Sequence, residues 1–276
     1  MLIAQLTDTH IKPAGETAYG KVDTAAFLRR AIQHLNALRP AVAAVFVTGD
    51  LADRGLDAEY ALLADILADL TAPVYLAAGN HDRRAGIRAA FPGHDYLKDN
   101  GQRDDGFIHY AVDLGHLRAV VLDSSVPGQP YGRFCPARLD WLESTLAQAP
   151  DRPTLIFQHH PPFKTGIRHM DVQNLQDAEA FLAVLARHPQ VAHVACGHVH
   201  RASETVLNGI GISIAPSPAH AVTLDLDPNG PASFTMEPPL LRLFHAPPGE
   251  PLVSHLSPIG AFDGPHPFFA EDGNIL

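Results

Sequence analysis

Short apolar runs recur along most of the chain, and most of them end at a turn-forming or polar residue. Runs of this length, rich in Val, Ile, Leu and Ala, are typical of strands that are buried on both faces. The pattern predicts strands at Leu2–Leu6, Ala41–Val47, Val74–Ala78, Phe107–Asp113, Leu117–Leu122, Thr154–Gln158, Val191–Cys196, Glu204–Leu207, Gly211–Ala215 and Ala221–Leu226.

Segments with one apolar stripe at helical spacing separate several of these runs. Asp23 or Thr24 can cap the first segment, which Pro40 ends, and Pro136 suits the first turn of a later one. The expected helices are Thr24–Leu38, Asp57–Leu70, Arg83–Phe91, Pro136–Ala149 and Gln176–Arg187. The stretch 92–106 is polar and predicts a loop.

This order of elements predicts an α/β fold. Strands first alternate with helices, then form a hairpin around Leu114-Gly115-His116, and then alternate with helices again. We therefore expect two mixed β-sheets packed as a sandwich and flanked by helices. Residues 1–201 would form the catalytic core, and residues 202–276 the remaining core strands with a small C-terminal cap or tail. The Pro- and Gly-rich part from Asp227 onward is expected to pack as that cap or tail.

Composition narrows the class of protein. Hydrophobic residues make up 46% of the chain and charged residues 18%, which is typical of a globular domain. A formal charge of −10 argues against a nucleic-acid partner, because such binding depends on clustered Lys and Arg. No apolar run approaches the ~20 residues of a membrane span. With two cysteines and no basic, apolar leader after Met1, we expect a cytoplasmic protein that binds no membrane.

Side chains that can bind metals follow five of the predicted strands. The chain has 17 histidines, so position has to separate candidate ligands from the rest. The five motifs are Asp8-x-His10, Gly49-Asp50, Gly79-Asn80-His81-Asp82, His159-His160-Pro161-Pro162 and Gly197-His198-x-His200. Because strand ends of this kind gather at one edge of an α/β sheet, we expect one shared site.

Two of the motifs use the strand period of two. In Asp8-x-His10 and His198-x-His200, alternate side chains point the same way and can reach one cation. Asp8-x-His10 taken alone is also compatible with an Asp that caps a turn beside a surface histidine. Asp50 can bridge two ions through its two carboxylate oxygens, although a turn-capping role remains open for it.

The remaining two motifs combine ligands with neighbouring groups. Asn80 offers an amide oxygen, while His81 beside it would point toward substrate and Asp82 would orient His81 from behind. His159 and His160 precede two prolines that fix the backbone direction, and the residues alone leave open which of the two is a ligand.

Together, the five motifs predict a dinuclear metal site. The donor set contains carboxylate, imidazole and amide groups without a thiolate cluster, which suits Fe, Mn, Co or Zn. Two such ions form a clamp for displacement at phosphorus and lower the pKa of bound water. We therefore predict hydrolysis of a phosphate ester.

The order of these motifs resembles that of the calcineurin-like metallophosphoesterase superfamily over residues 8 to 200. Within it, Gly15-Glu16-x-x-Tyr19-Gly20-x-x-Asp23 and Asp123-Ser124-Ser125 resemble the class III cyclic-nucleotide phosphodiesterases and the bacterial glycerophosphodiesterase group. Purple acid phosphatases of the superfamily carry Tyr three residues after the bridging Asp. This chain has Asp53 there, which argues against a tyrosinate-bound ferric centre.

The resemblance implies a role for each residue. Asp8, His10 and His200 would hold one divalent or trivalent ion, and Asn80, His159 and His198 the other. Asp50 would bridge both ions. His81 would stabilise the transition state or protonate the leaving alkoxide, with Asp82 supporting it, while a metal-bound hydroxide attacks phosphorus.

We therefore expect a metal-dependent phosphodiesterase that hydrolyses small glycerophosphodiesters or cyclic nucleotides. A phosphomonoesterase or nucleotidase is the alternative enzyme. A non-catalytic protein-binding scaffold is the alternative from another class. The resemblance also implies a homo-oligomer assembled through the C-terminal region.

Overall fold

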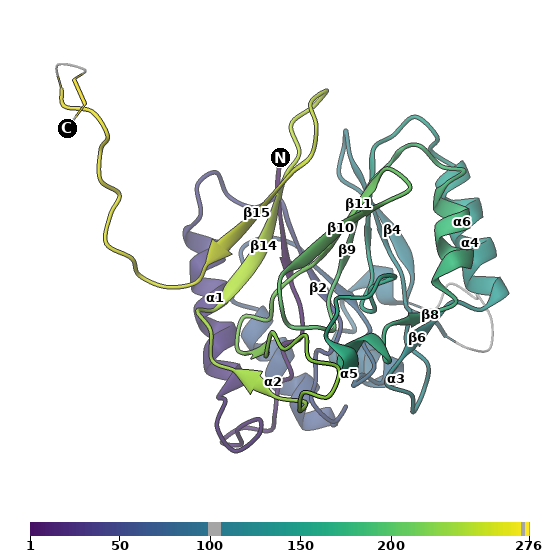
Figure 1. The fold of residues 1–276 in the computed structure, drawn as a ribbon, viewed down its shortest axis with the longest axis horizontal. Helices are drawn as coiled ribbons and strands as arrows, with labels where there is room; N and C mark the ends of the chain where they lie inside the picture. Colours follow the sequence, from purple (N-terminus) through teal and green to yellow (C-terminus); the bar gives the residue numbers. More distant parts are fainter. Residues whose placement is uncertain (99–105, 272–273, 276) are drawn as a thin grey trace.

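Two mixed β-sheets face each other in the computed structural model, which describes residues 1–98, 106–271 and 274–275 (Figure 1). The first sheet has the strand order β15-β14-β1-β2-β3. Its strands are β1 (Leu2–Leu6), β2 (Ala44–Thr48), β3 (Val74–Ala77), β14 (Leu240–His245) and β15 (Val253–Pro258). Strands β1, β2 and β3 are parallel, whereas β14 runs antiparallel to β1.

The second sheet has the order β10-β11-β9-β7-β5-β4. Its strands are β4 (Tyr110–Asp113), β5 (Arg118–Val121), β7 (Thr154–Phe157), β9 (Val191–Cys196), β10 (Ser203–Leu207) and β11 (Ile210–Ile214). The β4–β5 pair is the predicted hairpin, and β5, β7, β9 and β11 are parallel. The prediction of two mixed sheets in an α/β fold is confirmed.

Aromatic side chains join the two sheets at the centre of the sandwich. The rings of Phe46 on β2 and Phe157 on β7 stack with centroids 4.0 Å apart, and Phe244 on β14 meets Phe157 edge-on at 6.1 Å. All three rings are buried. Stacking of this kind adds to the burial of apolar area and fixes the distance between the strand ends of both sheets.

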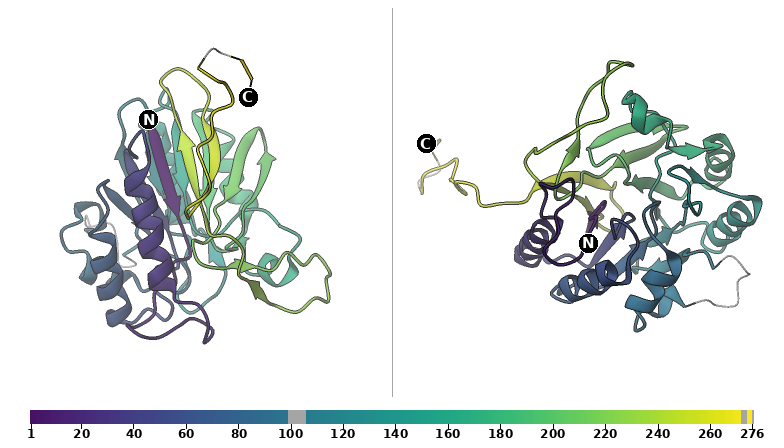
Figure 2. Two further views of the ribbon diagram at one scale, coloured as in Figure 1. Left: turned by 90° about the vertical axis from the view of Figure 1, so that its left-hand side faces the viewer. Right: turned by 90° about the horizontal axis from the view of Figure 1, so that it is seen from below.

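Helices cover the outer faces of both sheets (Figure 2). The helices of the structure are α1 (Thr24–Ala37), α2 (Asp57–Leu67), α3 (Arg84–Ala90), α4 (Pro136–Ala147), α5 (Arg168–Asp171) and α6 (Ala178–Leu185), with a 3-10 turn at Asp95–Leu97. The four-residue α5 lies below the strand ends (Figure 1). Asp23 caps α1 by accepting a hydrogen bond from Ala26 N, and α4 begins at Pro136, as the sequence predicts. No described helix is long and apolar enough to span a bilayer.

The segment after Asp227 corrects one expectation. Residues 240–258 are not a cap or tail, because they form β14 and β15, and β14 pairs directly with β1. The predicted strand 221–226 shrinks to β12 (Ala221–Val222), which pairs with β13 (Phe234–Thr235). Only the last part of the chain leaves the body, as an extended arm (Figure 1).

Five short elements of the described chain were not predicted. They are α5, the 3-10 turn at Asp95–Leu97, β13, and the two-residue strands β6 (Gly132–Arg133) and β8 (Leu175–Gln176), which pair with each other. Such elements carry too few residues for a periodic signal. Residues 99–105 of the loop expected over 92–106 lie outside the described residues.

Candidate metal centre

Residues from five strand ends meet between the two sheets. Asp8, Asp50 and Asn80 follow β1, β2 and β3 of the first sheet, whereas His159 and His198 follow β7 and β9 of the second. The backbone amide of His198 donates to the Asp8 carboxylate at 2.9 Å, which ties the sheets together at this point. The structure therefore brings the five sequence motifs into one place.

Two glycines allow this close approach. A Cβ at Gly197 would collide with Thr7 Oγ1, and a Cβ at Gly79 would collide with the backbone and carboxylate of Asp50. Both contacts involve atoms that cannot move away easily, because Thr7 and Asp50 are buried. Glycine at these positions lets the loops after β3 and β9 reach the loops after β1 and β2.

The backbone at the centre is unusually strained. Eight described residues other than glycine have positive φ, and five of them are candidate ligands. These are Asp8 (52°), His10 (40°), Asp50 (48°), His198 (76°) and His200 (55°). Left-handed backbone disfavours L-residues, so the packing around the site imposes it, and such strain clusters at functional sites.

Asp8, His10 and His200 form the first group of candidate ligands. One ligand atom of each lies within 4.8 Å of the others. His200 Nε2 is 3.1 Å from His10 Nε2 and 3.5 Å from Asp8 Oδ1, and all three side chains are buried. Two imidazole nitrogens and a carboxylate oxygen thus face one point.

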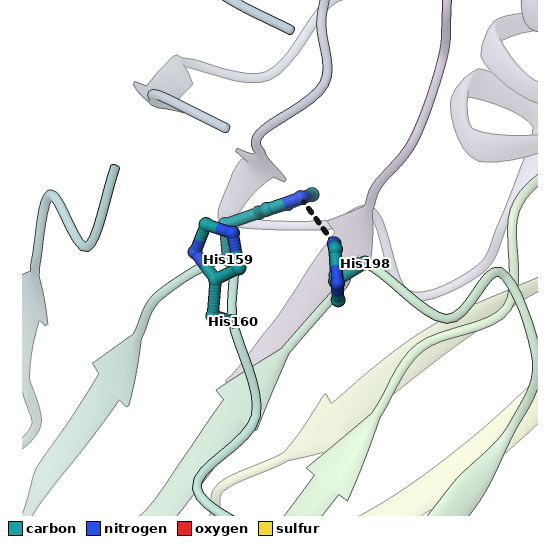
Figure 3. Close-up of side chains that lie close together, drawn as sticks. All are labelled: His159, His160 and His198. Atoms are coloured by element: carbon teal, nitrogen blue, oxygen red, sulfur yellow. Dashed lines mark hydrogen bonds between the residues drawn. The ribbon is translucent and has the colours of Figure 1, made fainter. Parts of the chain in front are cut away.

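Asn80, His159 and His198 form the second group. His159 Nε2 lies 3.1 Å from Asn80 Oδ1 and 3.3 Å from His198 Nδ1. His159 Nδ1 donates to the Thr48 carbonyl at 2.9 Å, which leaves Nε2 as the bare nitrogen. Figure 3 shows the rings of His159 and His198 joined across this contact, with His160 beside them.

Asp50 lies between the two groups. Its Oδ2 is 3.3 Å from His159 Nε2 and 3.5 Å from His10 Nε2. Its Oδ1 accepts a hydrogen bond from the backbone amide of His81 at 2.9 Å. One carboxylate oxygen therefore faces both groups while the other fixes the orientation of the carboxylate.

His160 has both ring nitrogens engaged elsewhere. Nδ1 is 2.8 Å from the Ser124 hydroxyl, and Nε2 is 3.2 Å from the Pro130 carbonyl. Because a carbonyl only accepts, Nε2 carries the proton and Nδ1 accepts from Ser124. This geometry favours His159 as the ligand at the double histidine, a choice that the residues alone left open.

The expectation that Asp82 contacts His81 is wrong. The Asp82 carboxylate turns away and accepts hydrogen bonds from the backbone amides of Gly79, Leu51 and Ala52 at 2.9 to 3.1 Å. His81 Nδ1 instead donates to the Asp53 carbonyl at 2.6 Å. Unpaired amides at two turns compete for a short buried carboxylate, and they hold Asp82 beneath the loop that carries Asn80 and His81.

Burial and mutual charge shift the pKa values of the acidic groups. Burial raises the pKa of Asp8 to about 6 and, together with the negative charge of Asp50, raises that of Asp82 to about 6. Burial would also raise the pKa of Asp50, but the positive charge of His159 holds it well below its usual value. Asp50 therefore stays ionised at neutral pH.

The histidines at the centre divide into two classes. Burial opposes protonation of His159, but Asp50 outweighs it and raises the pKa of His159 to about 9. Burial lowers the pKa of His198 to about 3 and holds that of His200 well below its usual value. Neutral imidazoles are the form that binds metals, so these two rings need no deprotonation before binding.

The donor set fits a pair of cations. Buried imidazole nitrogens and carboxylate oxygens face one another, and few of them can donate a hydrogen bond to a neighbour. Without a positive charge between them, this arrangement would raise the free energy of the folded state. His198 Nε2 and His200 Nδ1 are also buried without a hydrogen-bond partner among the described residues. Imidazole, carboxylate and amide donors in this number suit first-row transition metals.

Three residues near this centre were given no role in it by the sequence reasoning. The Asp53 carboxylate lies 3.6 Å from His10 Nδ1 and pairs with Lys12 Nζ at 2.7 Å. His220 packs against His200 with ring centroids 4.6 Å apart, and Tyr19 packs against His220 at 5.3 Å. Asp53 follows Asp50 closely enough to have been found, but His220 lies in a segment without any motif.

A cavity of about 440 Å³ opens in front of the centre. Its inner part is lined by His10, Asp50, Asn80, His81, His198 and His200. The ring of His81 is about 40% exposed there, and its Nε2 lies 4.0 Å from Asp50 Oδ2. A small ligand in the cavity would meet His81 and the clustered donors together.

The profile of the calcineurin-like phosphoesterases matches residues 1–202, which include all five motifs. The chain belongs to this family. The resemblance inferred from the motifs is thereby confirmed. The family uses a dinuclear metal centre, which agrees with the two groups of donors joined by Asp50.

The chain is also similar to named relatives and to a solved structure. It is 41% identical to a probable glycerophosphodiester phosphodiesterase of Arcobacter nitrofigilis over the full length of both chains. It is 40% identical to a probable cyclic nucleotide phosphodiesterase of Rhodopseudomonas palustris, over 87% of this chain and 86% of the relative. A dimetal phosphatase of Danio rerio shares the fold with a TM-score of 0.63 at 17% identity, over 92% and 98% of the two chains.

Proposed function

We propose that this protein is a dinuclear-metal phosphodiesterase that hydrolyses small diesters of the glycerophosphodiester or cyclic-nucleotide type. The observation that carries the proposal is the position of Asp50 Oδ2, within 3.5 Å of donor nitrogens in both groups. The printed names of two relatives at 40% and 41% identity support diesters as substrates.

We assign the ligands as follows. Asp8, His10 and His200 hold one ion, Asn80, His159 and His198 hold the other, and Asp50 contacts both. Bound ions of Fe, Mn, Co or Zn neutralise charge on the phosphoryl oxygens and lower the pKa of bound water. Asp82 supports this set indirectly, because its carboxylate binds the backbone amides of the loops that carry Asn80 and Asp50.

His81 acts on the substrate in this proposal. Since the Asp53 carbonyl can only accept, Nδ1 of His81 carries a proton and Nε2 is the nitrogen left to face the cavity. As an imidazolium, His81 donates from Nε2 to an oxygen of the phosphoryl group or of the leaving alkoxide. The Asp53 contact fixes the direction of the ring and thereby the direction of that proton.

The test uses purified protein loaded separately with Mn, Co, Fe or Zn. We expect hydrolysis of bis(p-nitrophenyl) phosphate with at least one metal and strong loss of activity in Asn80→Ala. Failure of the loaded protein with every metal, with no effect of Asn80→Ala, would falsify the proposal. A panel of glycerophosphodiesters, cyclic nucleotides and matched monoesters on the same preparation then separates a diesterase from a phosphomonoesterase or nucleotidase.

A scaffold that binds proteins without catalysis is the contrasting function. A scaffold of this kind would hold no tightly bound metal at the donor groups. Elemental analysis of freshly purified protein therefore separates the two functions: tightly bound transition metal rejects the scaffold, and its absence favours the scaffold. The buried, mutually facing donors of Asp8, Asp50 and His159 support the enzyme.

We also propose that the protein is a cytoplasmic homo-oligomer whose partners are small phosphodiesters rather than nucleic acid or membrane. Two free cysteines, Cys135 and Cys196, support a reducing compartment. The formal charge of −10 opposes binding to polyanions. Light scattering across a concentration series tests the assembly, and fractionation of the source cells tests the compartment.

A further inference from the structure

The outer part of the 440 Å³ cavity differs chemically from the inner part. Its lining residues are Tyr19, Met170, Gln173, His220, Val222, Ser233 and Phe234, together with Ala232. Apart from the imidazole of His220, these side chains are aromatic, apolar or neutral polar. Among the described residues, no lysine, arginine or glutamate lines the cavity, and its one carboxylate, Asp50, belongs to the metal centre.

Tyr19 is displayed from an anchored loop. Ala18 and Val22 exchange two backbone hydrogen bonds of 2.9 Å, and both are buried against Ala219. Tyr19 lies at the tip between them with φ +53°, and its residue surface is 60% exposed. The loop therefore holds a large and mostly exposed ring at a backbone angle that L-residues disfavour.

The exposed ring is supported from behind. Tyr19 and Phe234 lie with centroids 4.9 Å apart at an interplanar angle of 31°, and His220 meets Tyr19 edge-on at 5.3 Å. Phe234 is fixed by its register with Val222 in the β12–β13 pair. A continuous row of packed rings thus runs from His200 of the metal centre, through His220, to Tyr19 at the mouth of the cavity.

We infer that Tyr19 and Phe234 form a stacking face for one ester arm of the substrate, and that this face selects an uncharged arm with a flat aromatic ring, the chemistry of a nucleobase. The inference rests on the proposed function, because the metal centre has to hold the phosphate. An aromatic arm gains by stacking on Tyr19, and Gln173 and Ser233 offer neutral hydrogen bonds to polar atoms at the edge of the ring.

The charges around the face exclude the other kinds of arm. An arm with a further phosphate finds no lysine or arginine among the described residues that line the cavity. A cationic arm finds no carboxylate among the described residues that line the outer part, and it lies near the metal ions when these are bound. A short polyol arm reaches the hydrogen-bonding groups but leaves the aromatic face uncovered.

The experiment compares monoanionic phosphonates with a single varied arm on the metal-loaded enzyme. Phenyl methylphosphonate carries an aromatic ester arm, methyl methylphosphonate carries a methyl ester arm, and the choline ester of methylphosphonic acid carries a cationic ester arm. Binding is measured by calorimetry and by inhibition of bis(p-nitrophenyl) phosphate hydrolysis. We expect Tyr19→Ala to weaken binding of phenyl methylphosphonate by about 10-fold or more and to leave binding of methyl methylphosphonate unchanged.

Three variants serve as controls. Tyr19→Phe keeps the ring and should keep the preference, whereas Tyr19→Leu keeps apolar volume and should lose most of it. Phe268→Ala removes an 83% exposed ring from the C-terminal arm and should change nothing. Alanine, phenylalanine and leucine at position 19 all pay the energetic cost of a positive φ, so the backbone penalty is the same in the three Tyr19 variants.

Three results would overturn the inference. Equal weakening of the phenyl and methyl probes would show that Tyr19 acts on the phosphoryl group, and loss confined to the choline probe would show a cation site. Unchanged binding of every probe would also reject it. Failure of the proposed function is distinct, because then the wild-type enzyme would not hydrolyse bis(p-nitrophenyl) phosphate with any metal.

Discussion

The inner and outer parts of the active-site cavity are built in opposite ways. The inner part consists of side chains that directly follow β1, β2, β3 and β9, and four of them, His10, Asp50, His198 and His200, are buried and have left-handed backbone. The outer part comes from the Tyr19 loop, the α5 region and the β12–β13 pair, which lie outside the two large sheets.

This difference divides chemistry from selectivity. Ligand positions at strand ends cannot shift without disturbing the stacked rings of Phe46 and Phe157 in the core. Loops attached outside the sandwich can change their side chains at little cost to folding. We therefore expect substitutions in the inner part to abolish the reaction and substitutions in the outer part to change the substrate.

The largest effect is expected for Asp50→Asn. The amide keeps the shape of the side chain but removes the charge that faces both groups of ligands, so at least one ion should be lost. Activity should fall by more than ~100-fold, since even partners behind the ligands typically contribute 10- to 100-fold. Elemental analysis and kcat are the measurements. The exposed Asp65→Asn is the matched control, and full metal content in Asp50→Asn would contradict the assignment.

His81→Ala should give the next largest effect and separate catalysis from metal binding. Loss of a general acid typically costs 10²- to 10⁴-fold, so we expect kcat to fall by about 100-fold while metal content stays intact. The loss should be greater for an alkyl leaving group than for p-nitrophenolate, because only the alkoxide needs the proton. Equal losses for both leaving groups would assign His81 to charge stabilisation instead.

The same contrast explains how far the sequence alone could lead. Asp8, Asp50 and His198 follow long apolar runs, so strand periodicity located them and predicted their meeting. The strand pattern also predicted both sheets up to β11. It failed for β14, whose short run between prolines pairs with β1 at the other end of the chain. Local periodicity carries no information about such distant pairing.

The outer part of the cavity is still harder to predict from the sequence. His220 and Phe234 lie in Pro- and Gly-rich stretches, and only the packing of Ala18, Val22 and Ala219 brings them beside the Tyr19 loop. Asp82 was located correctly but given the wrong contact. The sequence places a carboxylate next to His81, whereas the unpaired amides that turn it away belong to another loop.

Asp123→Asn should affect stability without affecting the metal centre. Asp123 also follows a strand and is buried, but its carboxylate pairs with Arg84 and accepts from Ile108 N. Removing one partner of a buried pair should lower the free energy of unfolding by about 3 kcal/mol. Urea unfolding measures this loss, and unchanged metal content would confirm that not every carboxylate at a strand end is a ligand.

The effect of pH gives Asp123→Asn a second readout. Burial would raise the pKa of Asp123, but the hydrogen bond and charge of Arg84 outweigh it and lower the pKa below its ordinary 3.8. The stabilisation is therefore complete above that value and is lost as the pH falls through the folded-state pKa. The difference between wild type and variant should shrink only in acid. The exposed pair of Asp113 and Arg152 supplies the control, because Asp113→Asn should leave stability nearly unchanged.

Ser124→Ala should give the smallest effect and tests the division between His159 and His160. It removes the hydroxyl that donates to His160 Nδ1, so the free energy of unfolding should fall by about 1 to 2 kcal/mol. Metal content should remain complete, because His160 only supports the segment that carries His159. Thr71→Ala removes an exposed hydroxyl bond to Asn36 and is the control for loss of a hydroxyl. If Ser124→Ala instead lost one metal ion, this would indicate that His160 is a ligand and that the second ion lies farther from Asn80 than we propose.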